Sequence, residues 1–296
     1  MTIQGFIDVR EKLSVILDEI DADFRRAAVI AKAAGLKAVE LRMAFGRNIV
    51  ELQDSQLKEI KEYLESLDLK VCVLATPLLK CFLPGEEDKG KVGDQFGFPV
   101  NDYMTHKALV GRVVEIASFF ETKAVRCFSF WATGPLDEVK LHRIADLVAP
   151  VAEEAKKAGK TLLLENEPSC FVKTAKEASR LLSLINNDTP MVHFLWDPGN
   201  GKLEGEDEEE ALAEAGHLVK HVHLKDFVVQ DSKLKFVPPG RGTVDYETVL
   251  AGLREMGYEG FLSFEPCTGA WDEASFAQMV KEFIRLEKLA GGRGTS

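Results

Sequence analysis

Short runs of hydrophobic residues alternate with longer amphipathic segments from one end of the chain to the other. A short run rich in β-branched and aromatic residues is typical of a buried strand, whereas apolar residues spaced three or four apart are typical of a helix. Eight short runs therefore predict strands. They cover residues 13–20, 37–42, 70–76, 123–130, 161–167, 191–197, 219–226 and 260–266.

The amphipathic segments between these runs predict helices. They cover residues 23–35, 55–67, 103–121, 141–159, 174–185, 209–216, 246–257 and 273–291. Several end at a glycine (Gly35, Gly159, Gly216 and Gly257), the residue that often terminates a helix. Eight successive strand–helix units predict an α/β fold, a (β/α)₈ TIM barrel. Because no linker or shift of composition divides the chain, we expect residues 1–296 to form one domain.

The connection over residues 77–101 is too long for an ordinary barrel loop. Connections of this length inside a compact domain are usually functional or disordered, and this one contains Gly85, Gly90, Gly93 and Gly97. It follows the third predicted strand, so it should lie over the carboxyl-terminal mouth of the barrel, where active sites of such barrels lie. We predict that it acts as a lid.

The overall charge narrows the classes of partner. The formal net charge is −11 and the isoelectric point is about 5.2, which opposes nucleic-acid binding because such proteins gather Lys and Arg on one face. No apolar run approaches the roughly 20 residues of a membrane span, and the amino terminus has no leader pattern, so we expect a cytoplasmic protein without membrane contact. The five cysteines are scattered and include no CxxC pair, which opposes a disulfide framework.

The segment HVHLKDF at 221–227 places polar residues inside an otherwise apolar run. Strand alternation puts His221, His223 and Lys225 on one face and Asp226 on the other. By itself this pattern fits an edge strand with a solvated face as well as it fits a binding site. The other predicted strands decide between these interpretations.

Ionisable or amide groups stand at the carboxyl ends of four successive predicted strands. They are Glu165, Asn166 and Glu167, then Asp197, then His223 and Lys225, and then Glu265. Converging carboxylates repel one another, and a divalent cation with these groups as ligands removes the repulsion. One imidazole and three carboxylates form a hard ligand set that favours Mn²⁺ or Mg²⁺ and also accepts Co²⁺ or Zn²⁺. We therefore expect one divalent metal ion as cofactor.

The ordered motifs LLLENEP, WDPGNG, HVHLKD, PGRGTVDY and GFLSFEP resemble the sugar phosphate isomerase/epimerase branch of the xylose-isomerase-like superfamily. Each motif is weak alone, but the set extends over essentially the whole chain. The resemblance implies one metal ion on Glu165, Asp197, His223 and Glu265, with Glu165 and Glu265 also serving as acid and base. Ketose 3-epimerases of this family have a histidine where this chain has Asn200, which weakens that particular identity.

Several further residues are candidates for contact with substrate. Lys225 shares the face of His223 and could stabilise an enediolate oxygen, so we group it with the catalytic residues. Glu167, Asn200 and Arg241 are predicted to bind substrate, although Glu167 could instead hold a lysine or arginine, and the glycine-rich loop around Arg241 could be an ordinary turn. The pair Glu40 and Arg42, like Glu19, could support the site or touch substrate. The candidates for an apolar wall over a sugar ring are Phe82, Trp131 and Trp196.

These observations favour a metal-dependent isomerase or epimerase of a small sugar, sugar phosphate or related polyhydroxy carbonyl compound, acting through an enediolate. The alternative is an inosose-type dehydratase, which shares the first half-reaction. An apurinic-site endonuclease of the same superfamily would need a zinc cluster with more histidines, and a non-catalytic barrel would not need all four ligands. The partner is expected to be a carbohydrate-like small molecule, and the sequence leaves assembly into a homo-oligomer open.

Overall fold

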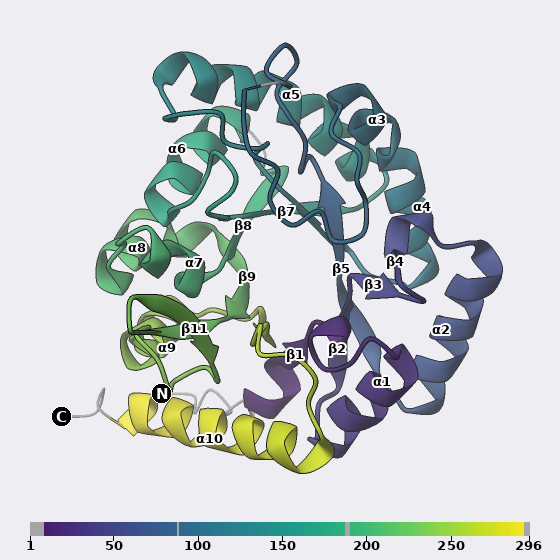
Figure 1. The fold of residues 1–296 in the computed structure, drawn as a ribbon, viewed down its shortest axis with the longest axis vertical. Coiled ribbons are helices and arrows are strands. Elements are labelled where there is room, and N and C mark those ends of the chain that lie inside the picture. Colours follow the sequence, from purple (N-terminus) through teal and green to yellow (C-terminus); the bar gives the residue numbers. More distant parts are fainter. Residues whose placement is uncertain (1–8, 88, 187–189, 293–296) are drawn as a thin grey trace, which may run out of the picture.

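The computed structural model describes residues 9–87, 89–186 and 190–292. Its eight main strands pair in parallel in the order β1-β12-β9-β8-β7-β6-β5-β2. They are β1 (Leu13–Val15), β2 (Ala38–Leu41), β5 (Lys70–Leu78), β6 (Ala124–Cys127), β7 (Thr161–Glu165), β8 (Val192–Trp196), β9 (Val219–Leu224) and β12 (Phe261–Phe264). A parallel bridge between Ile16 and Glu40 brings β1 beside β2 (Figure 1). The predicted TIM barrel is confirmed.

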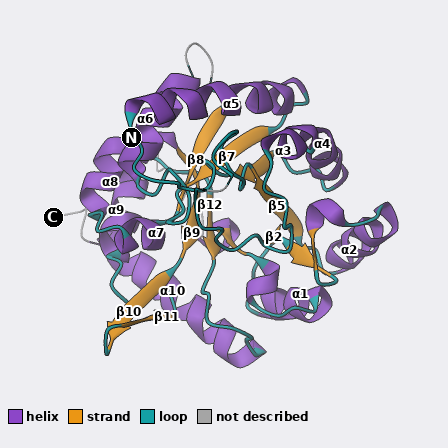
Figure 2. Cartoon of the chain, turned by 45° about the horizontal axis from the view of Figure 1, so that its top comes forward, coloured by secondary structure: helices purple, strands orange, loops and turns teal. Residues whose placement is uncertain are grey.

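Helices surround the strands on the outside (Figures 1 and 2). They are α1 (Phe24–Ala33), α2 (Asp54–Ser66), α3 (Tyr103–Ala108), α4 (Val110–Phe119), α5 (Glu138–Lys157), α6 (Ala175–Ile185), α7 (Pro198–Leu203), α8 (Glu208–Ala215), α9 (Tyr246–Glu255) and α10 (Glu273–Gly292). The shorter 3₁₀ turns are η1 (Val9–Lys12), η2 (Leu17–Glu19), η3 (Ile49–Glu51) and η4 (Gly216–Leu218). Side chains of Asp23, Asp137 and Asp207 cap the starts of α1, α5 and α8, where free backbone N–H groups need acceptors.

The strands bury both faces, as parallel strands covered by helices must. Their outward residues pack with the helices in one large hydrophobic cluster, while Val73, Leu163 and Leu195 form a separate small cluster. Leu163 and Leu195 precede Glu165 and Asp197 by two positions, so each pair lies on one face of its strand. The interior of the barrel is therefore apolar directly below Glu165 and Asp197, whereas His221 and Ser263 place polar groups below His223 and Glu265.

Two antiparallel hairpins were not expected from the sequence. β3 (Met43–Ala44) pairs with β4 (Arg47–Asn48), and β10 (Asp226–Gln230) pairs with β11 (Lys233–Val237), which projects from the barrel in Figure 2. The helix expected over 103–121 is divided at Leu109, and α7 was not predicted.

Three of the four predicted helix-ending glycines take the expected left-handed conformation. Gly35, Gly159 and Gly257 have φ of 89°, 70° and 68°. Gly216 does not, because its φ is −56° and the chain continues into η4. A Cβ atom at Gly216 would meet the end of the exposed Met256 side chain, which would have to move.

The connection from β5 to α3 lies over the barrel and is largely packed against it. Phe82 and Phe96 join Phe128 and Trp131 in a hydrophobic cluster. The buried His106 holds both ends of the connection, since its Nδ1 accepts a hydrogen bond from the Leu79 N–H (3.0 Å) and its Nε2 lies 3.0 Å from the Val100 carbonyl. The long connection therefore covers the mouth of the barrel.

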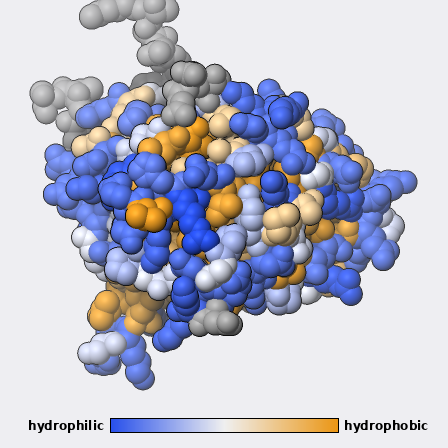
Figure 3. Space-filling model, turned by 90° about the horizontal axis from the view of Figure 1, so that it is seen from above, coloured by the Kyte–Doolittle hydropathy of each residue, from blue (hydrophilic) through white to orange (hydrophobic). Residues whose placement is uncertain are grey.

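No helix in the described part of the chain has the length and apolar character of a membrane span. Figure 3 shows a mainly hydrophilic face with scattered hydrophobic residues.

Candidate metal and substrate site

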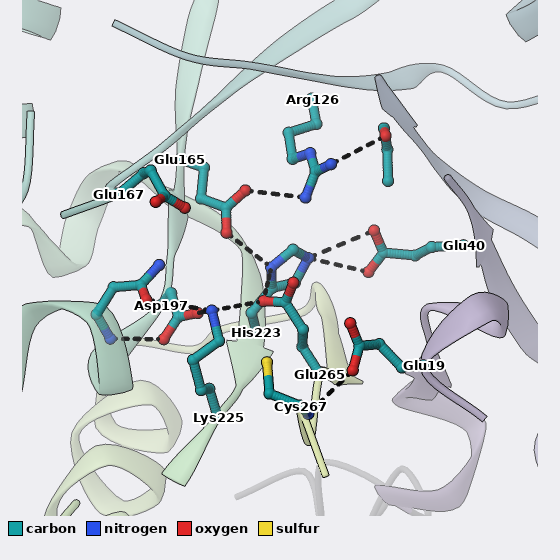
Figure 4. A network of polar contacts seen from close by, with 12 residues as sticks. Glu19, Glu40, Arg126, Glu165, Glu167, Asp197, His223, Lys225, Glu265 and Cys267 are labelled. Atoms are coloured by element: carbon teal, nitrogen blue, oxygen red, sulfur yellow. Dashed lines mark hydrogen bonds and ion pairs between the residues drawn. The ribbon is translucent and has the colours of Figure 1, made fainter. Parts of the chain in front are cut away.

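Four of the predicted side chains converge at the strand ends (Figure 4). Glu165, Asp197, His223 and Glu265 each offer one ligand atom, and these atoms lie within 4.8 Å of one another. All four residues are buried. They follow or end β7, β8, β9 and β12, so the barrel itself brings together residues that are 100 positions apart in the sequence.

Local hydrogen bonds fix the position of Asp197. The side chain of Asn166 accepts from the Asp197 N–H (2.8 Å) and donates to its carbonyl (2.9 Å). Asp197 Oδ1 accepts from the N–H of Asn200 and so caps α7. The other oxygen, Oδ2, points toward Lys225 and the rest of the site.

His223 presents different partners on its two nitrogens. Nδ1 lies 3.1 Å from Glu165 Oε1 and 3.3 Å from Glu265 Oε2. Nε2 lies 3.3 Å from Glu40 Oε1, and Glu40 also lies 2.6 Å from His221 Nε2. Burial lowers the pKa of His223, but Glu40 and Glu165 outweigh it and hold that pKa well above its usual range. Nδ1 faces the two glutamates of the quartet and is therefore the nitrogen that could bind a metal ion. Glu40 contacts Nε2 on the opposite side of the ring and orients it.

Two arginines hold the two glutamates. Arg126 Nη1 lies 3.1 Å from Glu165 Oε2, and Arg42 Nη1 lies 3.1 Å from Glu265 Oε1. Burial acts to raise the pKa of both carboxyl groups. At Glu165 this effect is outweighed mainly by Arg126 and His223. At Glu265 it is outweighed mainly by Lys225 and His223. Both pKa values are lowered as a result, so the carboxylates are ionised at neutral pH.

Lys225 reaches the centre of this group. Its Nζ lies 2.8 Å from Asp197 Oδ2 and 2.9 Å from Glu265 Oε2, and it donates a 3.1 Å hydrogen bond to Asn200 Oδ1. Burial lowers the pKa of Lys225, but Asp197 and Glu265 outweigh this effect and raise it well above the usual range. Lys225 is therefore a stable cation.

The donor set fits a divalent ion. Asp197 Oδ2 and Glu265 Oε2 are buried, and although Lys225 is near both, neither accepts a hydrogen bond of suitable geometry within the described residues. Burial raises the pKa of Asp197 to about 6, an effect that Lys225 reduces but does not cancel. Buried carboxylate oxygens without hydrogen bonds are suited to metal ligation, and three carboxylates with one imidazole suit Mn²⁺ or Mg²⁺.

Two neighbouring groups of ligand-type residues serve other purposes. Glu40, His221 and His223 form one group, in which Glu40 accepts from both rings. Glu19, Glu265 and Cys267 form the other, but Arg42 binds Glu19 (2.5 Å) as well as Glu265. Glu19, Glu40 and Arg42 thus support the quartet, one of the two roles considered for them from the sequence.

The structure separates the three predicted substrate-binding residues. Asn200 lies inside the site and holds Lys225. Glu167 lies at its edge, where it binds Ser169 and has Lys80 Nζ at 3.6 Å, so it holds a lysine as the alternative interpretation allowed. Arg241 is not brought to the quartet; its side chain is 61% exposed and pairs with Glu282 of α10 at 2.8 Å.

The glycine-rich loop beside Arg241 surrounds Asp226 instead of an open ligand site. Asp226 accepts hydrogen bonds from the backbone N–H groups of Gly240, Gly242 and Thr243, among others. A Cβ atom at Gly242 would collide with the Asp226 carboxylate. The glycines permit close approach of the backbone, as expected. The group that the backbone approaches is the Asp226 side chain of β10 and not a ligand.

Two buried cations near the site were not singled out from the sequence. Arg126 is a charged residue within the apolar run KAVRCFSF, and Lys80 is one within TPLLKCF. A charge in an otherwise apolar run could have identified both positions, but it would not have identified their partners. Only the fold brings Arg126 beside Glu165.

Comparison with known proteins agrees with this fold. A family model described as "Xylose isomerase-like TIM barrel" matches residues 28–285. The chain belongs to this family.

Among curated proteins, the chain is similar to an inosose dehydratase of Clostridium perfringens, 31% identical over 168 residues, which are 52% of this chain and 54% of that protein. It is also similar to an inosose dehydratase of Geobacillus kaustophilus, 30% identical over 164 residues, which are 49% of each chain. The chain thus spans about half the length of the curated relatives it matches.

Solved structures agree with the fold. A "probable 3-DHS dehydratase" from Bacillus anthracis superposes with a TM-score of 0.70 at 15% identity, covering 92% of this chain and 98% of that one. A D-allulose 3-epimerase from Methylomonas sp. gives 0.69 at 16%, covering 94% and 97%. A barrel from Mycobacterium smegmatis in complex with magnesium gives 0.66 at 16%, covering 90% and 89%. At these identities the likeness shows the fold alone.

Proposed function

We propose that the protein is a divalent-metal-dependent dehydratase of a cyclic polyhydroxy ketone, an inosose-type substrate. The observation that carries the proposal is the buried convergence of Glu165, Asp197, His223 and Glu265 with Lys225 beside them. The relatives named inosose dehydratase support this alternative over the isomerase or epimerase that the motifs favour.

The four residues of the quartet would hold the ion, which when bound supplies positive charge that stabilises an enediolate. The related barrel in complex with magnesium supports such a cofactor. Glu165 is the proposed base. Its lowered pKa keeps it ionised, and Arg126 fixes its Oε2. Its Oε1 faces His223 Nδ1 at 3.1 Å, so the ionised carboxylate lies within the quartet, where it is proposed to take a proton from the carbon beside the ketone.

Lys225 is proposed to donate a hydrogen bond to the enediolate oxygen, where its stable positive charge opposes the developing negative charge. The electron pair of the broken C–H bond enters the enediolate. When the carbonyl re-forms, the bond from the β carbon to its hydroxyl breaks, and the hydroxyl leaves as water with the proton that Glu165 received. The covering connection from β5 to α3 would exclude bulk water during these steps.

The test is incubation of Mn²⁺-loaded protein with an inosose in D₂O, followed by mass spectrometry and NMR. We expect a product that has lost one water. Deuterium exchange beside the carbonyl without water loss would refute dehydration, and absence of both would refute the enediolate.

Epimerisation is the second candidate, and one observation favours it. Glu165 and Glu265 are held by separate arginines, an arrangement suited to removal of a proton by one glutamate and its return by the other. In the same experiment, an epimerase acting on a ketose would give a stereoisomer with deuterium at the inverted carbon.

A further inference from the structure

Lys80 is a buried lysine on the connection between β5 and α3. Only 2% of it is exposed, and its Nζ has no hydrogen-bond partner in the described part of the chain. Glu167 Oε2 is 3.6 Å away, too far for a normal hydrogen bond. Buried ammonium groups almost always have acceptors for their three N–H donors. Lys80 is ion-paired with Glu167, but its donors indicate a hydrogen-bond acceptor that the described residues do not supply.

The surroundings of Lys80 are aromatic. Its Nζ lies 3.9 Å from the ring centroid of Phe96, 4.5 Å from that of Phe128 and 5.3 Å from that of Trp131. The negative faces of the rings partly replace the lost hydration of the cation. They do not replace directed hydrogen bonds, so the donors remain available to an oxygen-rich ligand.

Phe96 connects this pocket to the quartet. The guanidinium carbons of Arg42 and Arg126 each lie 4.8 Å from its ring centroid, and these arginines hold Glu265 and Glu165. The Phe96 ring is therefore in contact with both arginines that hold the two glutamates.

The backbone of Phe96 is itself unusual. Its φ is 50°, a left-handed conformation that is strained for a bulky residue, and Asn48 Nδ2 holds its carbonyl at 2.8 Å. The ring is thus held in the mouth by a strained backbone conformation.

We propose that Lys80 is a substrate-binding residue and that Phe96 occupies the substrate-ring position until substrate enters. A phenyl ring and a six-membered polyol ring are of similar size. When Phe96 leaves, Lys80 donates a hydrogen bond to a ring hydroxyl, and Phe128 and Trp131 pack on the C–H face of the ring. The predicted lid therefore carries one substrate contact and one residue that substrate displaces. This inference rests on the proposed function for its substrate class.

The test uses Mn²⁺-loaded protein and calorimetric titration with myo-inositol, a cyclic polyol that lacks the ketone. Lys80→Met keeps the side-chain length and removes the charge. Lys89→Met, the same change at an exposed position of the same connection, is the matched control. We expect Lys80→Met to weaken myo-inositol binding roughly ten- to hundred-fold, the worth of a hydrogen bond to a charged group, with unchanged Mn²⁺ affinity. Lys89→Met should bind like the parent.

Phe96→Ala tests the second part. Because the parent must first displace the ring, this variant should bind myo-inositol more tightly than the parent. Weaker binding would overturn the displacement of Phe96 and make it part of the pocket wall. Parental binding by Lys80→Met, with folding and Mn²⁺ affinity intact, would overturn the role of Lys80 and leave the proposed function standing.

The failure of the proposed function has a different signature. If the parent acts on an open-chain ketose and not on an inosose, dehydration of a cyclic ketone is wrong, and the comparison of Lys80→Met with Lys89→Met on that ketose decides the role of Lys80. A parent that neither binds myo-inositol nor converts an inosose or an open-chain ketose overturns both proposals.

Discussion

Glu40→Gln is the sharpest test of how the fold prepares His223. The substitution keeps the size of the side chain and removes its charge. Glu40 is fully buried, and its carboxylate lies 2.6 Å from His221 Nε2 and 3.3 Å from His223 Nε2. Burial acts to raise the pKa of Glu40, but the two histidines outweigh it and hold that pKa well below its usual range. Glu40 therefore accepts hydrogen bonds from both rings.

A glutamine offers one acceptor oxygen and one donor NH₂ group to these two nitrogens. If the oxygen stays with His221, the NH₂ group faces His223 Nε2, which must then be unprotonated. The proton of a neutral His223 would move to Nδ1, the nitrogen that faces Glu165 and Glu265. Loss of such an orienting carboxylate typically lowers metal affinity 10- to 100-fold, or about 1.4–2.7 kcal/mol. We expect an effect in that range.

The assay is competition between the protein and a chelator for Mn²⁺ at pH 7.5. Glu208→Gln is the matched control, because Glu208 is also buried but is paired with Lys202 at 2.8 Å, outside the site. Thermal unfolding establishes that both variants are folded. Mn²⁺ affinity within two-fold of the parent in a folded Glu40→Gln variant would refute the orienting role of Glu40.

Three further predictions concern the contacts of the site, and a fourth concerns Glu206, a carboxyl group outside it. Glu265→Gln should lower Mn²⁺ affinity more than Glu40→Gln does, by over roughly 100-fold, since it removes a ligand and not its support; chelator competition measures this, and parental affinity would refute the ligand assignment. Glu165→Asp and Lys225→Met should each retain metal but lower turnover by a factor on the order of 100, measured with the identified substrate; parental rates would refute the mechanism. Mn²⁺ affinity should fall as pH decreases from 8 to 5, because protons compete at His223, whose pKa is raised, and at Asp197, whose pKa is about 6; an affinity independent of pH would contradict this. Burial raises the pKa of Glu206 to about 7, so the folded state loses stability as pH rises from about 4.5 through 7. The variant Glu206→Gln cannot ionise, so it should raise Tm by roughly 2 °C or more at pH 8 and leave Tm unchanged at pH 4.

The barrel strands could be predicted because burial on both faces leaves a plain signal. Runs such as TLLLE and VHFLW are mainly apolar segments, and each forms a strand of the expected barrel. The boundaries were less accurate where the chain reaches the rim. Residues 13–20 were expected to form one strand, but β1 ends at Val15, Ile16 adds a single bridge to Glu40, and Leu17–Glu19 is a 3₁₀ turn that presents Glu19 to Arg42.

The hairpin β10–β11 was not predicted, although its second strand KLKFV alternates lysine with apolar residues. Lys233 to Lys235 are exposed, so this alternation does not mark a strand of the buried barrel. Arg241 was proposed as a substrate residue on the strength of its glycine neighbours. Those glycines are explained by Asp226, a contact set by the fold and not by local pattern.

The candidate site was predictable to the extent that it depends on strand ends. Alternation fixes which residues of a strand face inward, so Glu165, Asp197 and His223 could be grouped before the fold was known. The supporting charges could not be assigned in the same way. The pairing of Arg126 with Glu165 depends on which strands are adjacent and on how their registers align, and a single sequence does not state either.

The contacts of Lys225 connect metal binding to catalysis. Its Nζ is near Asp197 Oδ2 and Glu265 Oε2, the same buried oxygens that suit a divalent ion. A cation bound by these oxygens would weaken their attraction for the ammonium group, because the two positive charges repel and compete for the same partners. Asn200 would still hold Lys225 near the site. Metal binding would therefore free Lys225 donors for a substrate oxygen, which gives a physical reason for a buried lysine beside the candidate metal ligands.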